Sequence, residues 1–331
     1  MLPAQPHDHR ATEKQAGFVL VSVLWVVALL VVITISYHHR ARLEVRAARY
    51  SLDASQARMA ARAAMQRGIV ALRNKAVIDS LKHGLDKPQP PPTTHMGQPW
   101  ARARDLFREE GYLSPGDNFE NDVARYTIED MERFININAA SEDLLAELPG
   151  MTRPVARRIH YRQAGESDAQ GQAQRFQHIS ELRYIRGVDD DAWYGDDDSP
   201  GLRDVLTTYG DGRINLNTAP VEVLQSLPDV DPSVAEDLVT LRSGPDGISG
   251  TRDDIGFSDW EQFADATGVD GDSLISLKQF CKFNANYFRI KAVATRRGGM
   301  IHSQCSAIVL IPDGSNVASL LSWSEESLGA Q

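Results

Sequence analysis

The segment Phe18-Val-Leu-Val-Ser-Val-Leu-Trp-Val-Val-Ala-Leu-Leu-Val-Val-Ile-Thr-Ile-Ser-Tyr37 decides how the chain is organised. Its twenty residues include no charged residue, no glycine and no proline. At about 1.5 Å per residue, a helix of this length crosses the roughly 30 Å hydrocarbon core of a bilayer. The alternative is a buried core helix, but a core helix is seldom apolar around its whole circumference. The segment is therefore predicted to cross a membrane.

The residues before this segment differ from those of an ordinary secretory signal. No Ala-x-Ala cleavage site follows the run, which is longer than a signal core. The small-residue boundary Ala16-Gly17 comes before it, after a polar stretch with Arg10 and Lys14. This order resembles the leader of type IV pilins and pseudopilins. The resemblance implies that a prepilin peptidase on the cytoplasmic side cuts after Gly17, and that Phe18 becomes a methylated N-terminus on a retained helix.

One position departs from the usual pilin pattern. Pilins have a glutamate at the fifth mature position, whereas this chain has Ser22. Within the superfamily, absence of this glutamate marks one minor member, the type II secretion protein K (GspK) family. On these residues the chain resembles that family, and the later features can be compared with it.

Composition limits the function classes. A chain of 331 residues can hold the anchor and two modest domains. Its formal net charge of −10 argues against a generic nucleic-acid binder, which needs a local excess of lysine and arginine. Positive charges lie on both sides of the span, so charge alone does not set its orientation. The leader resemblance implies a single pass through the bacterial inner membrane, with a cytoplasmic N-terminus and a periplasmic head.

The chain after the span is rich in alanine, arginine and leucine, which are strong helix formers. The helix is expected to continue and to end between Asn74 and Gly84. The prolines of 87–99 predict an extended linker, followed by a short helix at 101–110. Residues 123–128 and 133–137 alternate in polarity and are predicted to form a hairpin with each other.

An internal repeat occupies the middle of the chain. Ile135-Asn-Ile-Asn-Ala-Ala140 recurs as Ile214-Asn-Leu-Asn-Thr-Ala219, and a Leu-Pro pair follows each copy at 148–149 and 227–228. Residues 153–163 and 232–242 then form a predicted second helix in each copy. Asn138 and Asn217 suit a helix-cap or turn position, where a side-chain oxygen accepts backbone N–H groups. Two related helical units are therefore expected.

Each copy resembles a helix-hairpin-helix, a module that binds DNA phosphates at helix N-termini. A membrane-anchored DNA receptor is therefore an alternative function. The details disagree, because Gly150-Met151 is followed by Thr152 rather than by glycine. In the second copy, Asp229 and Asp231 would repel phosphate. Both copies are interpreted as protein-facing modules of helix-hairpin-helix or SAM-like type, and no nucleic acid is expected as a partner.

The C-terminal part contains the clearest predicted hairpin. Residues 283–295 and 300–311 alternate in polarity, and Arg297-Gly-Gly299 supplies the turn. The serine-rich tail from Asp313 is expected to be loosely held.

The loop Gly244-Pro-Asp-Gly-Ile-Ser-Gly-Thr-Arg-Asp-Asp-Ile255 is a candidate cation site. Asp246, Asp253 and Asp254 supply hard oxygen ligands of the kind that Ca²⁺ takes, and the glycines free the backbone to bend. The spacing is not that of an EF-hand, and a solvated acidic turn is the alternative. Resemblance to the K family, whose members have calcium sites in the helical domain, favours a structural Ca²⁺. The aspartate runs 189–191 and 196–198 are weaker candidates.

The remaining reactive residues indicate no catalytic set. The chain has no Gly-x-Ser-x-Gly, no His-Glu-x-x-His and no Walker loop, so an enzyme is not expected. An anchored enzyme with an unrecognised set of residues remains a minor alternative. Cys281 and Cys305 have no metal-like spacing, and in a periplasmic head they are candidates for a disulfide.

The resemblance implies an α+β fold, namely a pilin-like fold with a long N-terminal transmembrane helix, an antiparallel sheet and a large all-α insertion. The implied function is non-enzymatic. It is that of a minor pseudopilin at the tip of the periplasmic pseudopilus, which assembles with the minor pseudopilins I and J to start the fibre for protein secretion. The expected segments are a leader (1–17), the long helix (18–84), the first part of the head (85–137), the insertion (138–280), the last strands (281–312) and the tail (313–331).

Overall fold

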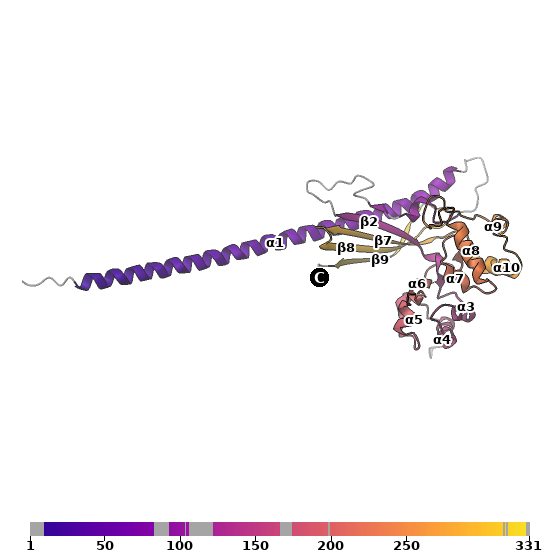
Figure 1. The fold of residues 1–331 in the computed structure, drawn as a ribbon, viewed down its shortest axis with the longest axis horizontal. Helices are drawn as coiled ribbons and strands as arrows, with labels where there is room; N and C mark the ends of the chain where they lie inside the picture. Colours follow the sequence, from indigo (N-terminus) through magenta and orange to yellow (C-terminus); the bar gives the residue numbers. More distant parts are fainter. Residues whose placement is uncertain are drawn as a thin grey trace, which may run out of the picture. The chain divides into compact units, whose positions relative to one another are not determined.

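The computed structural model describes residues 10–82, 93–102, 104–105, 122–165, 174–197, 199–313, 315 and 317–328. The fold is α+β, with a long N-terminal helix, an antiparallel sheet and a set of short helices (Figure 1). The chain divides into two compact units, residues 1–56 and 57–331, which are described separately.

Helix α1 runs without interruption from Arg10 to Lys82 and belongs to both units. Its continuity follows from the sequence, because this stretch contains no proline and its strong helix formers are interrupted by few glycines. In unit 1, the apolar side chains from Phe18 to Tyr37 are all exposed. The long helix expected from the sequence is therefore confirmed, and it ends within the expected range.

In unit 2, α1 packs against one face of the sheet through a stripe of small residues (Figure 1). The closest approach is at Gly68, where an added Cβ would lie 2.8 Å from Cγ2 of Ile290. Only a residue without a side chain fits this distance unless Ile290 moves. A fragment beginning at Asn74 would lose the buried face of this helix. That face comprises Ala57, Ala61, Ala64, Met65, Gly68 and Leu72.

The sheet has the strand order β1-β2-β7-β8-β9, and every neighbouring pair is antiparallel. The expected C-terminal hairpin is confirmed as β7 and β8, and its turn at Arg297, Gly298 and Gly299 has positive φ throughout. Alternate residues of these strands are buried against α1, as the sequence pattern predicts. The strands are β1 (Arg104–Asp105), β2 (Val123–Asp130), β7 (Tyr287–Arg296), β8 (Ile301–Leu310) and β9 (Ser319–Leu328).

Two predictions about the first part of the head are wrong. Strand β2 pairs with β7 rather than with 133–137, because a 3-10 helix (η2, Met131–Arg133) turns the chain away from the sheet. In place of the helix predicted at 101–110, the described residues show a 3-10 helix (η1, Pro99–Ala101) and then strand β1. Residues 103 and 106–110 of that prediction, and 87–92 of the predicted linker, lie outside the described residues.

The expectation of a loosely held tail is also wrong, because β9 completes the sheet. It pairs with β8 over its length and has one β-bulge. Trp323 and Glu325 lie opposite Ala307 and Cys305, on the face of the sheet that α1 covers. The strand was missed because its bulge at Leu321 interrupts the alternation of apolar and polar residues.

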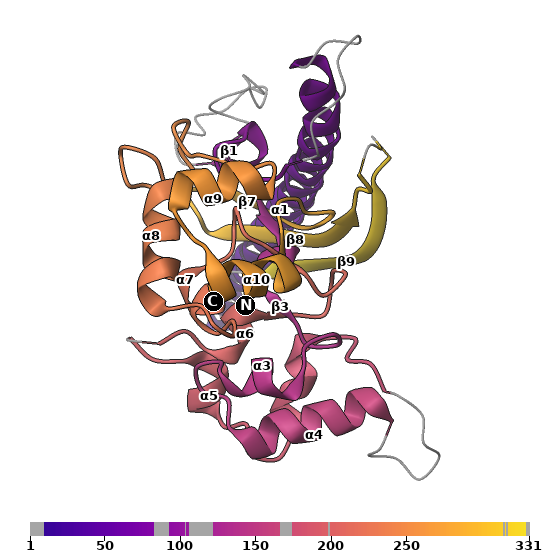
Figure 2. The same cartoon turned by 90° about the vertical axis from the view of Figure 1, so that its right-hand side faces the viewer.

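The inserted helices lie between β2 and β7 and form two copies of one arrangement (Figure 2). Each copy begins and ends in a two-residue strand, and these strands pair in parallel: β3 with β4, and β5 with β6. The first copy comprises β3 (Ile135–Asn136), α3 (Glu142–Ala146), α4 (Arg153–Ala164), η3 (Ile179–Tyr184), α5 (Asp190–Tyr194), α6 (Leu202–Val205) and β4 (Leu206–Thr207). The second comprises β5 (Ile214–Asn215), α7 (Val221–Gln225), α8 (Pro232–Arg242), α9 (Trp260–Thr267), α10 (Gly271–Phe280) and β6 (Cys281–Lys282).

An asparagine holds each copy together in the same way. Asn138 Nδ2 donates to the carbonyl of Phe176 (2.9 Å), and the N–H of Phe176 donates to Asn138 Oδ1 (2.8 Å). Asn217 makes the same pair of bonds with Phe257, at 2.9 Å each. The two asparagines therefore bridge distant segments and do not make the local bond expected of them. Their own N–H groups donate to Oδ1 of Asn136 and Asn215, which make the local turns. The cap of α3 is Ser141, and the residue before α7 is Pro220.

The two copies share one hydrophobic core. It extends from Ile135 in the first copy to Phe283 beyond the second, and it includes the fully buried Phe257 and Phe263. The two copies therefore stabilise each other and are not independent modules.

Replacing the bridging asparagines tests this construction. Asn217 is 1% exposed and also donates to the carbonyl of Phe283, whereas Asn138 is half-buried. Leaving buried backbone groups without partners costs about 1–3 kcal/mol each. Asn217→Ala is therefore expected to lower the free energy of unfolding by about 3 kcal/mol, and Asn138→Ala by about 1 kcal/mol. Chemical denaturation of the full chain in detergent measures both, and equal losses would contradict the expectation.

Candidate functional site

The predicted processing site lies at the start of the described part of α1. Residues 1–9 of the leader lie outside the described residues, as do the side chains up to Gly17. Phe18 is helical and 75% exposed. In the described part of the chain, α1 is the one helix long and apolar enough to cross a membrane, and none of its apolar window is buried. These properties fit a single-pass membrane anchor, and they are shared by signal sequences near an N-terminus.

The hydroxyl of Ser22 is hydrogen-bonded within the helix. Its Oγ donates to the carbonyl of Phe18, four residues earlier, at 2.9 Å. It therefore presents no free carboxylate or other charge on this face of α1.

The glycine-aspartate loop is organised by hydrogen bonds to its own carboxylates. Asp254, which is 9% exposed, accepts from the backbone N–H of Gly250 (2.7 Å) and of Thr251 (3.3 Å). Asp253 accepts from the Thr251 hydroxyl (2.6 Å) and from the N–H of Asp246 (3.2 Å). The hydrogen bond from Thr251 lowers the pKa of Asp253. The carboxylates that a cation would need as ligands therefore already accept hydrogen bonds from the loop itself.

The carboxylate oxygens of this loop are ligands of the kind that Ca²⁺ takes, but they do not converge on one point. No group of three histidine, cysteine, aspartate or glutamate side chains converges among the described residues. Asp246 Oδ1 instead accepts from the N–H of Ile248, at 2.8 Å. The weaker aspartate runs are also engaged in local structure, since Asp189 caps α5 by accepting from the N–H of Ala192.

The candidate disulfide between Cys281 and Cys305 is not formed in the structure. Both thiols are free and buried. Cys281 lies in β6 beside Ile214, within the core of the insertion. Cys305 lies in the middle of β8 between Ala292 and Glu325, within the core under α1. Because the two residues belong to different sheets and different cores, each is a packing residue. Burial raises the pKa of both thiols.

A buried polar cluster joins the sheet to the insertion, and sequence analysis missed it. Asp130, the last residue of β2, accepts from the N–H of Glu132 (2.8 Å) and from the side chains of Asn215 (2.8 Å) and Thr218 (2.6 Å). All four residues are at most 2% exposed. Burial raises the pKa of Asp130 to about 6, although the hydrogen bonds from Thr218 and Asn215 oppose this shift.

The adjacent Glu132 forms a buried ion pair across the insertion. Its Oε1 lies 2.8 Å from Nζ of Lys282 in β6, and the side chains are 1% and 6% exposed. Its Oε2 accepts from the N–H of Asn286, at 2.6 Å. Glu132 and Lys282 are 150 positions apart, so no local sequence pattern could have predicted that they form an ion pair.

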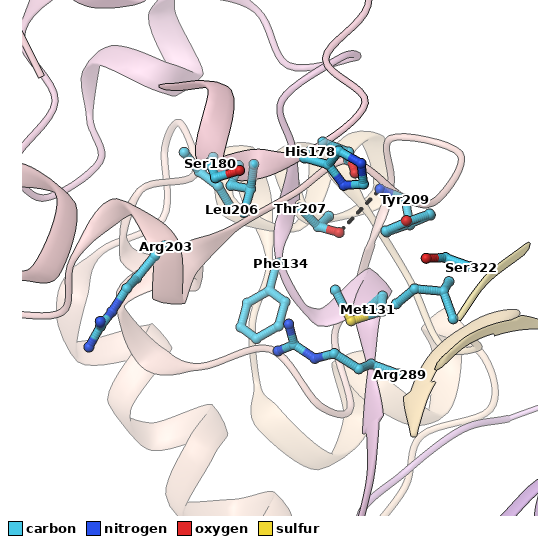
Figure 3. Close-up of a pocket in the computed structure, with 13 residues that line it drawn as sticks. Met131, Phe134, His178, Ser180, Arg203, Leu206, Thr207, Tyr209, Arg289 and Ser322 are labelled. Carbon is cyan, nitrogen blue, oxygen red and sulfur yellow. Dashed lines mark hydrogen bonds between the residues drawn. The ribbon is translucent and has the colours of Figure 1, made fainter. Parts of the chain in front are cut away.

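A cavity of about 260 Å³ is lined by residues of the sheet and of the first copy of the insertion (Figure 3). Its apolar lining includes Met131, Phe134, Leu206 and Ile308, all buried. Its volume is below the roughly 300–1,000 Å³ of typical small-molecule pockets. The other lining residues are His178, Ile179, Ser180, Arg203, Thr207, Thr208, Tyr209, Arg289 and Ser322.

Comparison with solved structures shows a related fold. This chain resembles a chain in the crystal structure of the GspK–GspI–GspJ complex from the type 2 secretion system of enterotoxigenic Escherichia coli. The two are 17% identical with a TM-score of 0.54, and the match covers 84% of this chain and 99% of that chain. No family model and no curated protein matches the sequence. The likeness covers most of both chains, and it supports a GspK-like fold.

The pKa of Asp130 predicts how stability depends on pH. A carboxyl group with a pKa near 6 in the folded chain and 3.8 when unfolded binds its proton more tightly when folded. Its contribution to stability is therefore greatest below pH 4, falls as the pH rises through 6, and stays constant above about pH 7. Relative to Asp130→Asn, the native chain should gain about 2 kcal/mol between pH 7 and pH 4.

Denaturant unfolding at both pH values measures this difference. Asp265→Asn, at an exposed position, is the matched control and should show no such change relative to the native chain. The expectation is wrong if Asp130→Asn and the native chain change in parallel between the two pH values.

Proposed function

We propose that the chain is a minor pseudopilin of a type II secretion system, a non-enzymatic subunit at the tip of the periplasmic pseudopilus. The observation that supports this most is the fold, which matches a chain of the GspK–GspI–GspJ complex over 84% of the present sequence. The apolar first half of α1 supports an anchor in the inner membrane, since one uninterrupted helix joins it to the core under the sheet. In this arrangement the N-terminus is cytoplasmic and the head is periplasmic.

Two features support a place at the tip. In a fibre, the glutamate at the fifth mature position pairs with the N-terminal amine of a neighbouring subunit, and Ser22 offers no carboxylate for this. The second feature is the insertion between β2 and β7, which adds two helical units to the head and would obstruct another subunit above it. Its partners would be minor pseudopilins of the I and J types, with which it would start fibre assembly.

The DNA-receptor alternative lacks support from the described residues. In the second copy, Asp231 occupies the position before α8 without a capping hydrogen bond from its side chain, and Asp229 precedes it with positive φ. Two carboxylates thus stand at the helix N-terminus where a phosphate would have to bind. The helix-hairpin-helix or SAM-like classification of the copies stays a prediction.

Co-expression tests the proposed function. The full chain is extracted in detergent together with the I-type and J-type pseudopilins encoded beside it, and the mass of the purified assembly is measured. We expect a complex that contains all three proteins, and deletion of the gene should abolish secretion through that system. A chain that purifies alone, with secretion unaffected by its deletion, would contradict the proposal.

Processing gives a more specific expectation. Cleavage after Gly17 should leave Phe18 as a methylated N-terminus, because the prepilin peptidase needs a small residue at the cut. Gly17→Val should leave the leader attached, whereas Thr12→Val, within the leader but away from the cut, should be processed normally. Intact-mass analysis of the purified protein distinguishes the two. A mature protein that begins after Tyr37 would show that the apolar segment is a cleaved signal.

Calcium binding by the glycine-aspartate loop also stays a prediction. Binding requires Asp253 and Asp254 to exchange their hydrogen bonds for the cation. A ligand at a hundred times its Kd stabilises the folded state by about 2.7 kcal/mol, so millimolar Ca²⁺ should raise the Tm by several degrees over chelator. Magnesium should substitute poorly, because it demands a smaller octahedron.

Two matched double variants distinguish calcium binding by the loop from a general effect of removing negative charge. Asp253→Ala with Asp254→Ala should remove the calcium-dependent shift in Tm. Asp265→Ala with Asp272→Ala, two exposed residues of the same insertion, should retain it. A Tm that ignores Ca²⁺ in the native chain would show that the loop is only a closed acidic turn.

A further inference from the structure

Strand β9 leaves one edge of the sheet open. It pairs with β8 on one side, and among the described residues no strand pairs with its other side. An open edge presents unpaired N–H and C=O groups, and natural proteins protect such edges with lysine, proline, bulges or charge. Strand β9 has no lysine or proline, and its bulge is confined to Leu321.

Large apolar side chains gather along this edge. Leu320, Leu321 and Trp323 are 54%, 47% and 36% exposed, and Val317 just before the strand is 62% exposed. The acidic residues give limited protection, because Arg62 of α1 lies 2.8 Å from Glu325 and pairs with its charge. Glu326 is the acidic residue of β9 that stays exposed on the outer face. Exposed apolar area at an unpaired edge favours association with another strand.

The cavity lies in register with this edge. Arg289 of β7 pairs with Ile308 of β8, which pairs with Ser322 of β9, and all three line the cavity (Figure 3). This row of side chains ends at Ser322, whose side chain is small. On a strand added beyond β9, at the usual spacing of about 4.8 Å, the residue opposite Ser322 would continue the row. Its side chain would then reach the apolar lining formed by Met131 and Phe134.

We propose that β9 adds an extended segment of a partner pseudopilin as a sixth strand of this sheet. This inference rests on the proposed function and names the surface by which the complex forms. The partner segment has a large apolar or aromatic side chain opposite Ser322, which enters the cavity. Four residues along, on the same face, it has a basic side chain opposite Glu326. Backbone hydrogen bonds supply affinity, and these two side chains supply specificity.

The test uses the full chain co-expressed with the I-type and J-type pseudopilins and extracted in detergent. Ser322→Tyr fills the cavity from within and should weaken the complex at least tenfold. Ser324→Tyr places the same side chain two residues along, on the same face but outside the cavity lining, and should change affinity less than threefold. Glu326→Arg, at an exposed position, should also weaken the complex and is not expected to disturb folding.

A photo-crosslinking residue in place of Leu320 identifies the protein that lies next to the open edge of β9. The expected product is a crosslink to one of the two partner pseudopilins, and Tm values near that of the native chain check folding of each variant. A complex that forms with native affinity in both Ser322→Tyr and Glu326→Arg would overturn this inference and leave the proposed function intact. A crosslink to a second copy of the chain would overturn the choice of partner. Failure of the native chain to form any complex would instead overturn the proposed function, and this inference with it.

Discussion

The buried ion pair between Glu132 and Lys282 is the contact on which the rest of the head depends. Glu132 directly follows β2, where the insertion leaves the sheet, and Lys282 ends the insertion shortly before β7. Because both side chains are almost fully buried, loss of Lys282 would leave the charge of Glu132 without its ion-pair partner, at a cost of about 3–5 kcal/mol. Asp130 adds hydrogen bonds to Asn215 and Thr218 of the second copy. Both ends of a long insertion are thereby fixed to the sheet.

Small residues play the corresponding role on the other face of the sheet. The alanines of α1 and Gly68 let the helix lie directly on β7, with Ile290 against its backbone. The helix that would anchor the chain in the membrane is therefore also part of the core of the head. The two faces of the sheet differ in what they leave accessible to a partner. The face under α1 is closed, whereas the outer face has a cavity that is in register with the open edge at β9.

The sequence was sufficient where the signal was local and periodic. Strong helix formers predicted the uninterrupted helix α1, alternation around Arg297 to Gly299 predicted the β7–β8 hairpin, and the recurring Asn138 and Asn217 predicted two related units. The sequence was insufficient where two residues or strands that pair in the fold lie far apart in the chain. Strand β2 alternates like a hairpin strand, but its partner β7 lies beyond the whole insertion. The two cysteines are close in sequence yet lie in different sheets, and the Glu132–Lys282 pair has no local pattern at all. The serine-rich β9 was missed because its apolar residues do not alternate strictly across the bulge.

Native-state hydrogen exchange of the full chain in detergent tests most directly whether sheet and insertion form one cooperative unit. The slowest amides of β7 and β8 and those of α7 and α8 are expected to exchange with the same free energy of opening. Lys282→Met should lower that free energy equally in both regions, because it removes the contact that joins them. Helical amides that open at a markedly lower free energy than the sheet, and a Lys282→Met variant that affects only the insertion, would contradict this account.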